Sequence, residues 1–285
     1  MARRGARPNE SVRQCFLSAM ADIIRAGAAT AGPSGVRRFV RWICGHVLPP
    51  LAYPVLRGPL RGARFILGAG AGQGGGASVY INRVEPTQTR ALLAHVGPGQ
   101  VVFDIGANVG YYTLLASRRV GPSGRVLAFE PLPRNISYLY RHLALNDIEN
   151  VTLIPLACSD RSILTPFVAG DNCATGRLAD AKYGPVPGRC EYVATVAVDE
   201  IVRESGLRPD LLKIDVEGAE EQVLKGAAET LALARPTVLL SVHSDALRSA
   251  CTAYLLNLGY GEPVVCEEPE GGVELFFTHP ARSGR

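Results

Sequence analysis

From residue 85 onward, short apolar runs alternate with longer stretches in which hydrophobic residues recur every three or four positions. The first pattern is typical of buried strands and the second of amphipathic helices. Strands are predicted at 100–105, 125–130, 151–158, 191–198, 211–214, 237–242 and 275–278. Helices are predicted after the first strand through residue 119 and at 133–145, 219–231 and 245–258, and a short one begins at Asp199 as its N-cap. This alternation indicates a doubly wound α/β fold, with a mostly parallel Rossmann-like sheet between two layers of helices.

The first 62 residues have a different pattern. An amphipathic helix is predicted over 12–24, and the apolar segment 39–56 is interrupted by charged residues and prolines. A membrane-spanning helix needs about 20 mostly apolar residues without such breaks. We therefore expect a basic helical segment, 1–62, packed on a catalytic domain, 63–285, whose core covers about 85–280. The alternatives for this segment are a membrane-surface helix and a lid over the substrate. Packing on the domain is favoured over peripheral contact with a membrane.

Two further strands are predicted at 64–67 and 78–81, on either side of a glycine-rich loop, 68–76. A glycine-rich loop that binds phosphate should open a helix. This loop leads into a β-like run instead, so the pattern favours a short β hairpin.

Composition and charge narrow the functional classes. The chain has 285 residues and a formal net charge of +4, and much of the basic excess lies before residue 65. A catalytic region closer to neutral does not favour nucleic acid as a partner. The seven cysteines are scattered and form no C-x-x-C pair, which indicates free thiols in a reducing compartment. We expect a cytoplasmic protein without a metal site.

A glycine turn follows the first strand of the predicted sheet. The strand ends at Asp104, and Gly106 and Gly110 flank Asn108 before a helix begins. Ligands of open α/β sheets bind beyond the carboxyl ends of the strands. The spacing differs from the G-x-G-x-x-G pattern of dinucleotide sites, whose glycines admit a pyrophosphate. S-adenosylmethionine has no phosphate, and Asp104 offers an acceptor for its amino end, directly or through water.

Acidic residues end the next two strands. Glu130 follows Gly110 by twenty positions, where its carboxylate can accept hydrogen bonds from both hydroxyls of a ribose. Asp160 follows the third strand and can accept from an adenine amino group, although an ordinary turn carboxylate explains it equally well. The glycine turn and Glu130 together predict a nucleoside ligand.

Here the chain resembles the FkbM family of S-adenosylmethionine-dependent methyltransferases, from about residue 85 to 280. The resemblance rests on D-I-G-A-N-V-G-Y at 104–111, A-F-E-P at 128–131, L-N at 145–146, K-I-D-V-E-G-A-E at 213–220 and L-G-Y at 258–260. It implies a class I methyltransferase fold and transfer of a methyl group, usually to a hydroxyl of a sugar or a secondary metabolite.

The remaining strand ends carry the candidate catalytic residues. Asp215 and Glu217 follow the strand 211–214, and His243 follows 237–242. An alcohol must lose its proton during methyl transfer, and His243 is the best candidate for a neutral base because imidazole titrates near neutrality. A structural histidine bonded to backbone is the alternative. Asp215 and Glu217 are the alternative bases, and with His243 they form a less favoured divalent-metal site.

The resembling family often has an acid two residues before this histidine, and here that position is Ser241. This departure puts a charged Glu–His pair in doubt. The expected acceptor is a hydroxyl of a small molecule or glycan, and residues 165–189 are expected to form an insertion that sets its specificity. The alternative function is a nucleoside- or dinucleotide-binding protein without methyl transfer, either a non-catalytic binder or an oxidoreductase. The motifs give no oligomeric state.

Overall fold

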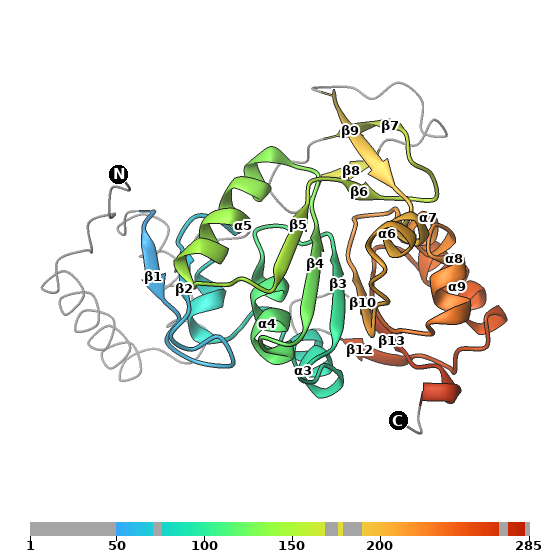
Figure 1. Ribbon diagram of the computed structural model, residues 1–285, viewed down its shortest axis with the longest axis horizontal. Helices are drawn as coiled ribbons and strands as arrows, with labels where there is room; N and C mark the ends of the chain where they lie inside the picture. Colours follow the sequence, from blue (N-terminus) through green and yellow to red (C-terminus); the bar gives the residue numbers. More distant parts are fainter. Residues whose placement is uncertain (1–49, 71–75, 169–175, 179–189, 268–272, 283–285) are drawn as a thin grey trace, which may run out of the picture.

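The computed structural model describes residues 50–70, 76–168, 176–178, 190–267 and 273–282 (Figure 1). The helix expected over 12–24, most of the apolar segment 39–56 and the centre of the glycine-rich loop lie outside these ranges. In the described ranges, each helix is too short or too polar to cross a lipid bilayer.

A mostly parallel sheet forms the centre of the described structure, as predicted. Its strands are β3 (Val101–Ile105), β4 (Arg125–Phe129), β5 (Val151–Ile154), β10 (Leu211–Ile214), β11 (Thr237–Val242), β12 (Val264–Glu267) and β13 (Val273–Phe277). Within the described ranges their order is β12-β13-β11-β10-β3-β4-β5. The five strands from β11 to β5 are parallel, and near one edge β13 runs antiparallel to both of its neighbours, β11 and β12.

Helices cover both faces of this sheet, which confirms the doubly wound prediction (Figure 1). They are α3 (Pro86–His95), α4 (Tyr111–Val120), α5 (Pro133–Leu145), α6 (Val198–Ser205), α7 (Glu220–Lys225), α8 (Ala228–Leu233) and α9 (Asp245–Asn257). Successive strand residues point to opposite faces. Leu211 therefore belongs to the core under α3, α4 and α5, whereas Leu212 belongs to the core under α6 to α9.

The predicted strand 151–158 is wrong as one element. Pro155 has no backbone N–H to continue a ladder, and the chain leaves the central sheet after Ile154. Ala157–Cys158 is β6, which pairs with β9 (Cys190–Val196) in a second sheet. In the described ranges this sheet has the order β6-β9-β7-β8, with β7 (Leu164–Val168) and β8 (Arg177–Leu178) in the predicted insertion.

The predicted helix 219–231 is two helices, α7 and α8. A side chain at Gly226 would have its Cβ 2.0 Å from the carbonyl oxygen of Ser159, so the chain can pack here only as glycine. The N-cap of α6 is Ala197 and not Asp199 as predicted; Asp199 lies in the first turn of this helix. Its carboxylate instead accepts from the backbone N–H groups of Glu229 and Thr230, at the start of α8.

The predicted strand 78–81 is also wrong. Residues Ala77–Ile81 form a 3₁₀ helix that left-handed residues flank, Gly76 with φ 83° and Asn82 with φ 57°. The strand β2 (Arg64–Ile66) pairs instead with β1 (Ala52–Pro54). The division at residue 62 stays a prediction, and the β1–β2 hairpin spans it.

The edge strand β12 was not predicted, and its hydrophobic residues Val264 and Val265 are both exposed. The last predicted strand, 275–278, corresponds to β13 and lies one strand inside this edge.

Candidate active site

A cavity of about 530 Å³ lies at the carboxyl ends of the parallel strands. Gly106 follows β3, Glu130 follows β4, Asp215 follows β10 and His243 follows β11, and all four line the cavity. The second sheet closes part of it through Phe167 and Leu178. Strands far apart in sequence therefore bring the glycine turn and the candidate base into one cavity.

The glycine turn is shaped by close backbone packing. Gly106 has φ 80°, and a Cβ there would lie 1.8 Å from the carbonyl oxygen of Asp215. Gly110 has φ 95°, and its Cβ would lie 2.3 Å from Cδ1 of Leu139. Gly106 borders the cavity, whereas Gly110 starts α4 and packs on α5. The position of Gly106 is therefore compatible with the predicted close approach of a ligand. At Gly110, the missing side chain allows α4 to pack against α5.

Glu130 lines this cavity, and it also holds the glycine turn together. Its Oε2 accepts from the backbone N–H of Asn108 at 2.9 Å and its Oε1 from that of Leu132 at 2.9 Å. Each carboxylate oxygen can accept a second hydrogen bond. Burial raises the pKa of Glu130, and the two backbone donors oppose that shift. Glu130 is 5% exposed, and the side chain of Asn135 donates a further hydrogen bond to its carboxylate.

Asp104 differs from its expected placement. Its side chain is 1% exposed, accepts from Thr113 Oγ1 at 2.6 Å and lies 3.5 Å from Nζ of Lys213. It is absent from the described lining of the cavity, which Lys213 reaches. Asp104 points under α4 because it alternates with Phe103 on the other face. A direct bond from Asp104 to a ligand in the cavity does not fit this geometry.

Lys213 is a buried cation that the sequence analysis did not identify. Its ammonium donates to the carbonyl of Gly106 at 3.3 Å and lies 3.5 Å from Oδ2 of Asp215. Burial alone would lower the pKa of Lys213, but the charges of Asp215 and Asp104 outweigh it and raise the pKa. Strand alternation from Asp215 could have revealed it, since residues two apart on a strand share a face.

Asp160 lies outside the described lining of the cavity. Its carboxylate is 36% exposed and contacts Ser159 Oγ at 3.2 Å and Arg161 Nε at 3.6 Å. Ala157 and Cys158 line the cavity at this edge. Asn146, the second residue of the L-N pair, binds the backbone of Arg64 in β2. Neither side chain reaches a ligand at the cavity in this arrangement.

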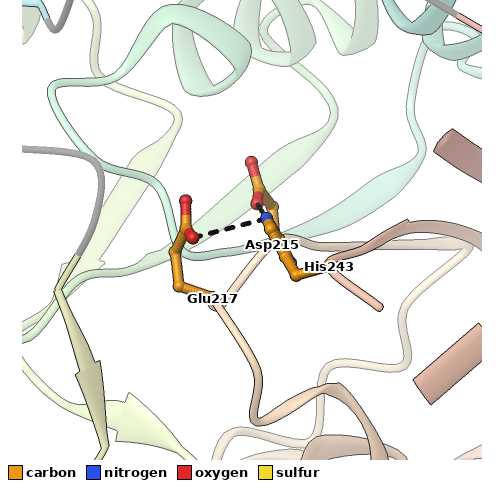
Figure 2. Close-up of side chains that lie close together, drawn as sticks. All are labelled: Asp215, Glu217 and His243. Carbon is orange, nitrogen blue, oxygen red and sulfur yellow. Dashed lines mark ion pairs between the residues drawn. The ribbon is translucent and has the colours of Figure 1, made fainter. Parts of the chain in front are cut away.

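The three candidate catalytic residues converge, and Figure 2 shows the two carboxylates facing the His243 ring. His243 Nε2 lies 3.7 Å from Asp215 Oδ1 and 3.5 Å from Glu217 Oε2. Burial raises the pKa of Glu217, against the charge of His243. One ligand atom from each residue lies within 4.8 Å of the others, a spacing that could hold a divalent cation. The expectation of no metal stays a prediction.

Glu220 supplies the acid partner that the sequence put in doubt. Its Oε1 lies 2.8 Å from His243 Nδ1, and the side chain is fully buried at the start of α7. The hydrogen bond with Glu220 raises the pKa of His243 to about 9, which burial only partly opposes. His243 is therefore mostly protonated at neutral pH, contrary to the expected neutral base. Glu220 closes the K-I-D-V-E-G-A-E motif, but its contact with β11 needs the tertiary fold.

Ser241 has a different carboxylate beside it. Its Oγ donates to Oε2 of Glu274 at 2.7 Å, and Gln88 Nε2 donates to the same oxygen at 2.6 Å. Burial foremost raises the pKa of Glu274 to about 7. Neither Gln88 nor Glu274 was predicted as a site residue, because α3 and β13 lie far apart in the sequence and meet only in the folded chain.

The chain matches the family model of the methyltransferase FkbM domain over residues 104–260. It is 30% identical to methyltransferase sdnD of Sordaria araneosa over 198 residues, 59% of this chain and 76% of that protein. It is also 30% identical to 31-O-demethyl-FK506 methyltransferase FkbM of Streptomyces tacrolimicus over 209 residues, 63% and 80% of the two chains. Hexuronic acid methyltransferase AglP of Haloferax volcanii is 30% identical over 152 residues, 52% of this chain and 59% of AglP.

Among solved structures, methyltransferase FkbM from Methylobacillus flagellatus superposes with a TM-score of 0.51 at 19% identity. The match covers 70% of this chain and 49% of that one, so the chain spans about half the length of this structural relative. The likeness shows the same fold. With a family model that covers more than half of its residues, and with the glycine turn and the K-I-D-V-E-G-A-E motif facing one cavity, the chain belongs to the FkbM family of methyltransferases.

Proposed function

We propose that this protein transfers the methyl group of S-adenosylmethionine to a hydroxyl of a sugar or a secondary metabolite. The observation that carries the proposal is the shared cavity, in which Glu130 beside the glycine turn lies on the same rim as His243, Asp215 and Glu217. The names of AglP and of the FK506 methyltransferase support a hydroxyl-bearing acceptor. When bound, S-adenosylmethionine supplies an activated methyl group on a sulfonium.

Glu130 and Asn108 fit the nucleoside. The Glu130 carboxylate lines the cavity and can accept from a ribose hydroxyl while it holds the turn. Asn108 Oδ1 is buried and has no hydrogen-bond partner among the described residues, and Asn108 lines the cavity. A buried acceptor without a donor is costly, and a ligand hydroxyl or ammonium would relieve that cost. Asp104 acts indirectly, through Lys213 and the Gly106 carbonyl that Lys213 holds.

His243 is the proposed base. The acceptor oxygen forms a bond to the methyl carbon as the carbon–sulfur bond breaks, and His243 Nε2 takes the hydroxyl proton. The positive charge that leaves the sulfonium thus appears on the imidazole ring. Glu220 on Nδ1 stabilises that imidazolium and orients the ring. Asp215 and Glu217 flank Nε2 and orient the hydroxyl, since in-line displacement depends on position.

Calorimetry with two classes of ligand tests the cofactor. We expect binding of S-adenosylmethionine and S-adenosylhomocysteine, and weak or no binding of nicotinamide dinucleotides, because the turn lacks the third glycine of a pyrophosphate site. Tight binding of a nicotinamide dinucleotide without binding of S-adenosylmethionine would refute the proposal and favour an oxidoreductase.

A methyl-transfer screen against hydroxylated sugars, polyketides and lipids, read by mass spectrometry, tests the reaction. Cofactor binding without any transfer would favour the non-catalytic binder. The same assay in the presence of a chelator tests whether the reaction needs a metal ion. No metal is expected, so the chelator should leave the rate unchanged. Loss of the rate with the chelator, and its return with a divalent cation, would assign Asp215, Glu217 and His243 as metal ligands.

A further inference from the structure

Glu274 is a buried carboxylate that has no role in the proposed methyl transfer. It lines the cavity, yet its side chain belongs to β13, beyond the strands that carry the candidate base and the glycine turn. It is 6% exposed. Burying a carboxylate without a counter-charge costs free energy. Its presence here therefore indicates a role in ligand binding.

The two donors that hold Glu274 both reach the same oxygen. Ser241 Oγ and Gln88 Nε2 donate to Oε2, at 2.7 and 2.6 Å, and Gln88 Nε2 also lies 3.0 Å from Ser241 Oγ. Oε1 makes no hydrogen bond with the described residues. No basic side chain in the described ranges lies within ion-pair distance of this carboxylate. The network fixes one oxygen and leaves the other for a ligand.

The position of β13 separates Glu274 from the cofactor end. Glu274 is the register partner of Ser241 on β11. Neighbouring strands lie about 4.8 Å apart, so β13 is about 10 Å from β10, which carries Asp215, and about 19 Å from β4, which carries Glu130. His243 and Asp215 therefore lie between Glu274 and the nucleoside side of the cavity. A group that reaches Glu274 past them belongs to the acceptor.

The charge of the lining limits what that group can be. The carboxylates of Glu85, Glu130, Asp215, Glu217 and Glu274 line the cavity, against the basic side chains of Arg83, Lys213 and His243. Lys213 is already held by Asp104 and Asp215, and His243 by Glu220. The raised pKa of Glu274 reflects its burial first and then the nearby charge of Asp215. An acceptor carboxylate at this position would meet repulsion, and a hydrogen-bond donor would not.

From this geometry, and resting on the proposed methyl transfer, we infer that Glu274 Oε1 is a specificity determinant that binds a hydrogen-bond donor on the acceptor, separate from the hydroxyl that is methylated. The acceptor is thus a polyol or an amino sugar, and its donor is a hydroxyl or an ammonium. Hexuronic acids, the substrate class in the name of AglP, are disfavoured at this site.

A competition experiment at pH 8 tests the inference, because Glu274 with a pKa of about 7 is mostly ionised there. The enzyme receives S-adenosylmethionine and equal amounts of a methyl glucoside, the 2-amino glucoside and the glucuronide, and mass spectrometry reads the methylated products. We expect the neutral and amino glycosides to react at least about tenfold faster than the glucuronide. Glu274→Gln should reduce that preference about tenfold, mainly through the KM of the glycoside, and leave the dissociation constant of S-adenosylhomocysteine unchanged.

Glu267→Gln is the matched control, since Glu267 is an exposed residue of the neighbouring strand β12 outside the described cavity lining. It should keep the wild-type preference. Ser241→Ala removes one of the two donors to Oε2 and should shift the preference in the same direction by less, which provides a second variant if Glu274→Gln fails to fold.

Three results would overturn the inference. One is a wild-type enzyme that prefers the glucuronide, which would point to Arg83 instead. Another is an equal preference in Glu274→Gln and Glu267→Gln. A third is a weaker affinity for S-adenosylhomocysteine in Glu274→Gln with an unchanged glycoside preference, which would place Glu274 at the cofactor.

If no glycoside is methylated, saturation-transfer NMR of the same three glycosides with the S-adenosylhomocysteine complex decides the question without the reaction. Weaker binding of the glucuronide than of the other two glycosides, and loss of this difference in Glu274→Gln, would support the proposed role of Glu274 even if the proposed methyl transfer is wrong. Absence of binding, or the same order in both proteins, refutes it.

Discussion

At the scale of single residues, the hydrogen bond between Glu220 and His243 decides when the proposed base can act. A general base must be neutral before it takes a proton, and the pKa of His243 is raised to about 9. The methylation rate should therefore rise about tenfold per pH unit below pH 9 and flatten above it. Replacement of His243 by Ala should lower the rate about 10²–10⁴-fold, with cofactor affinity nearly intact. His243→Gln should be as slow, because Gln can orient a hydroxyl but cannot take its proton.

The Glu220→Gln variant separates the base from its positioning residue. Without the carboxylate on Nδ1, the pKa of His243 should fall and the midpoint of the pH–rate profile should move to lower pH. Glu221→Gln is the matched control, because Glu221 pairs with Lys225 on the outside of α7. Its profile should keep the wild-type midpoint. The hypothesis fails if the wild type, Glu220→Gln and Glu221→Gln share one pH–rate profile and both His243 variants keep the wild-type rate. His243 would then be structural, and Asp215 and Glu217 would be the next candidates for the base.

Glu130 has two tasks at this scale, and a substitution should show both. Glu130→Ala should weaken S-adenosylmethionine binding by about 1–3 kcal/mol through lost charge-assisted hydrogen bonds. It should also lower Tm, since the backbone N–H groups of Asn108 and Leu132 lose their acceptor. Calorimetry and thermal melts measure the two effects. A dissociation constant equal to that of the wild type would remove Glu130 from the cofactor site.

At the scale of elements, the break between α7 and α8 is stabilised from outside both helices. Asp199 of α6 accepts from Glu229 N at 2.9 Å, Thr230 N at 2.8 Å and Thr230 Oγ1 at 2.6 Å. These bonds satisfy N–H groups that a helix start leaves without partners. Asp199→Ala should lower the free energy of unfolding by about 1–2 kcal/mol, measured by urea denaturation. Asp245→Ala, in the exposed first turn of α9, should cost less, and equal losses would argue against the cap.

At the scale of the whole molecule, His142 joins the β1–β2 hairpin to the glycine turn. Its Nε2 accepts from Ile66 N at 3.0 Å, and its Nδ1 lies 2.7 Å from the carbonyl of Val109. Burial lowers the pKa of His142 from 6.5 to about 4, so the folded protein keeps the ring neutral. The stability that this neutral ring provides is present above pH 6.5 and is lost as the pH falls towards 4, by roughly 3 kcal/mol at most.

A comparison of the wild type with His142→Gln isolates this effect from the other titrating groups. The difference in the free energy of unfolding between the two proteins should shrink as the pH falls from 6.5 to 4. A difference that is constant over this range would show that His142 titrates alike in the folded and unfolded chains.

The accuracy of the sequence predictions followed the range of the interactions involved. Strands β3, β4, β10 and β11 were predicted closely, because continuous apolar runs bounded by turns depend on local pattern. The convergence of Glu130, Asp215 and His243 followed from a rule of parallel sheets, that their carboxyl ends share one rim. The direction of Asp104, the split at Pro155 and the 3₁₀ helix at Ala77–Ile81 depend on packing partners that a local pattern does not contain.

By itself, the sequence determined the doubly wound fold class, most strands of the central sheet, the membership of the FkbM family and the meeting of Glu130, Asp215 and His243 at one rim. These properties follow from hydrophobic periodicity and from motifs in which glycines and acids stand at fixed distances along one chain. Only the tertiary structure decided which acid serves which group: Glu220 for His243, Glu274 for Ser241 and Asp104 for Lys213. The physical reason is that these contacts depend on ångström distances between side chains, and all three pairs join residues more than twenty positions apart, whose distance in space only the packed fold fixes.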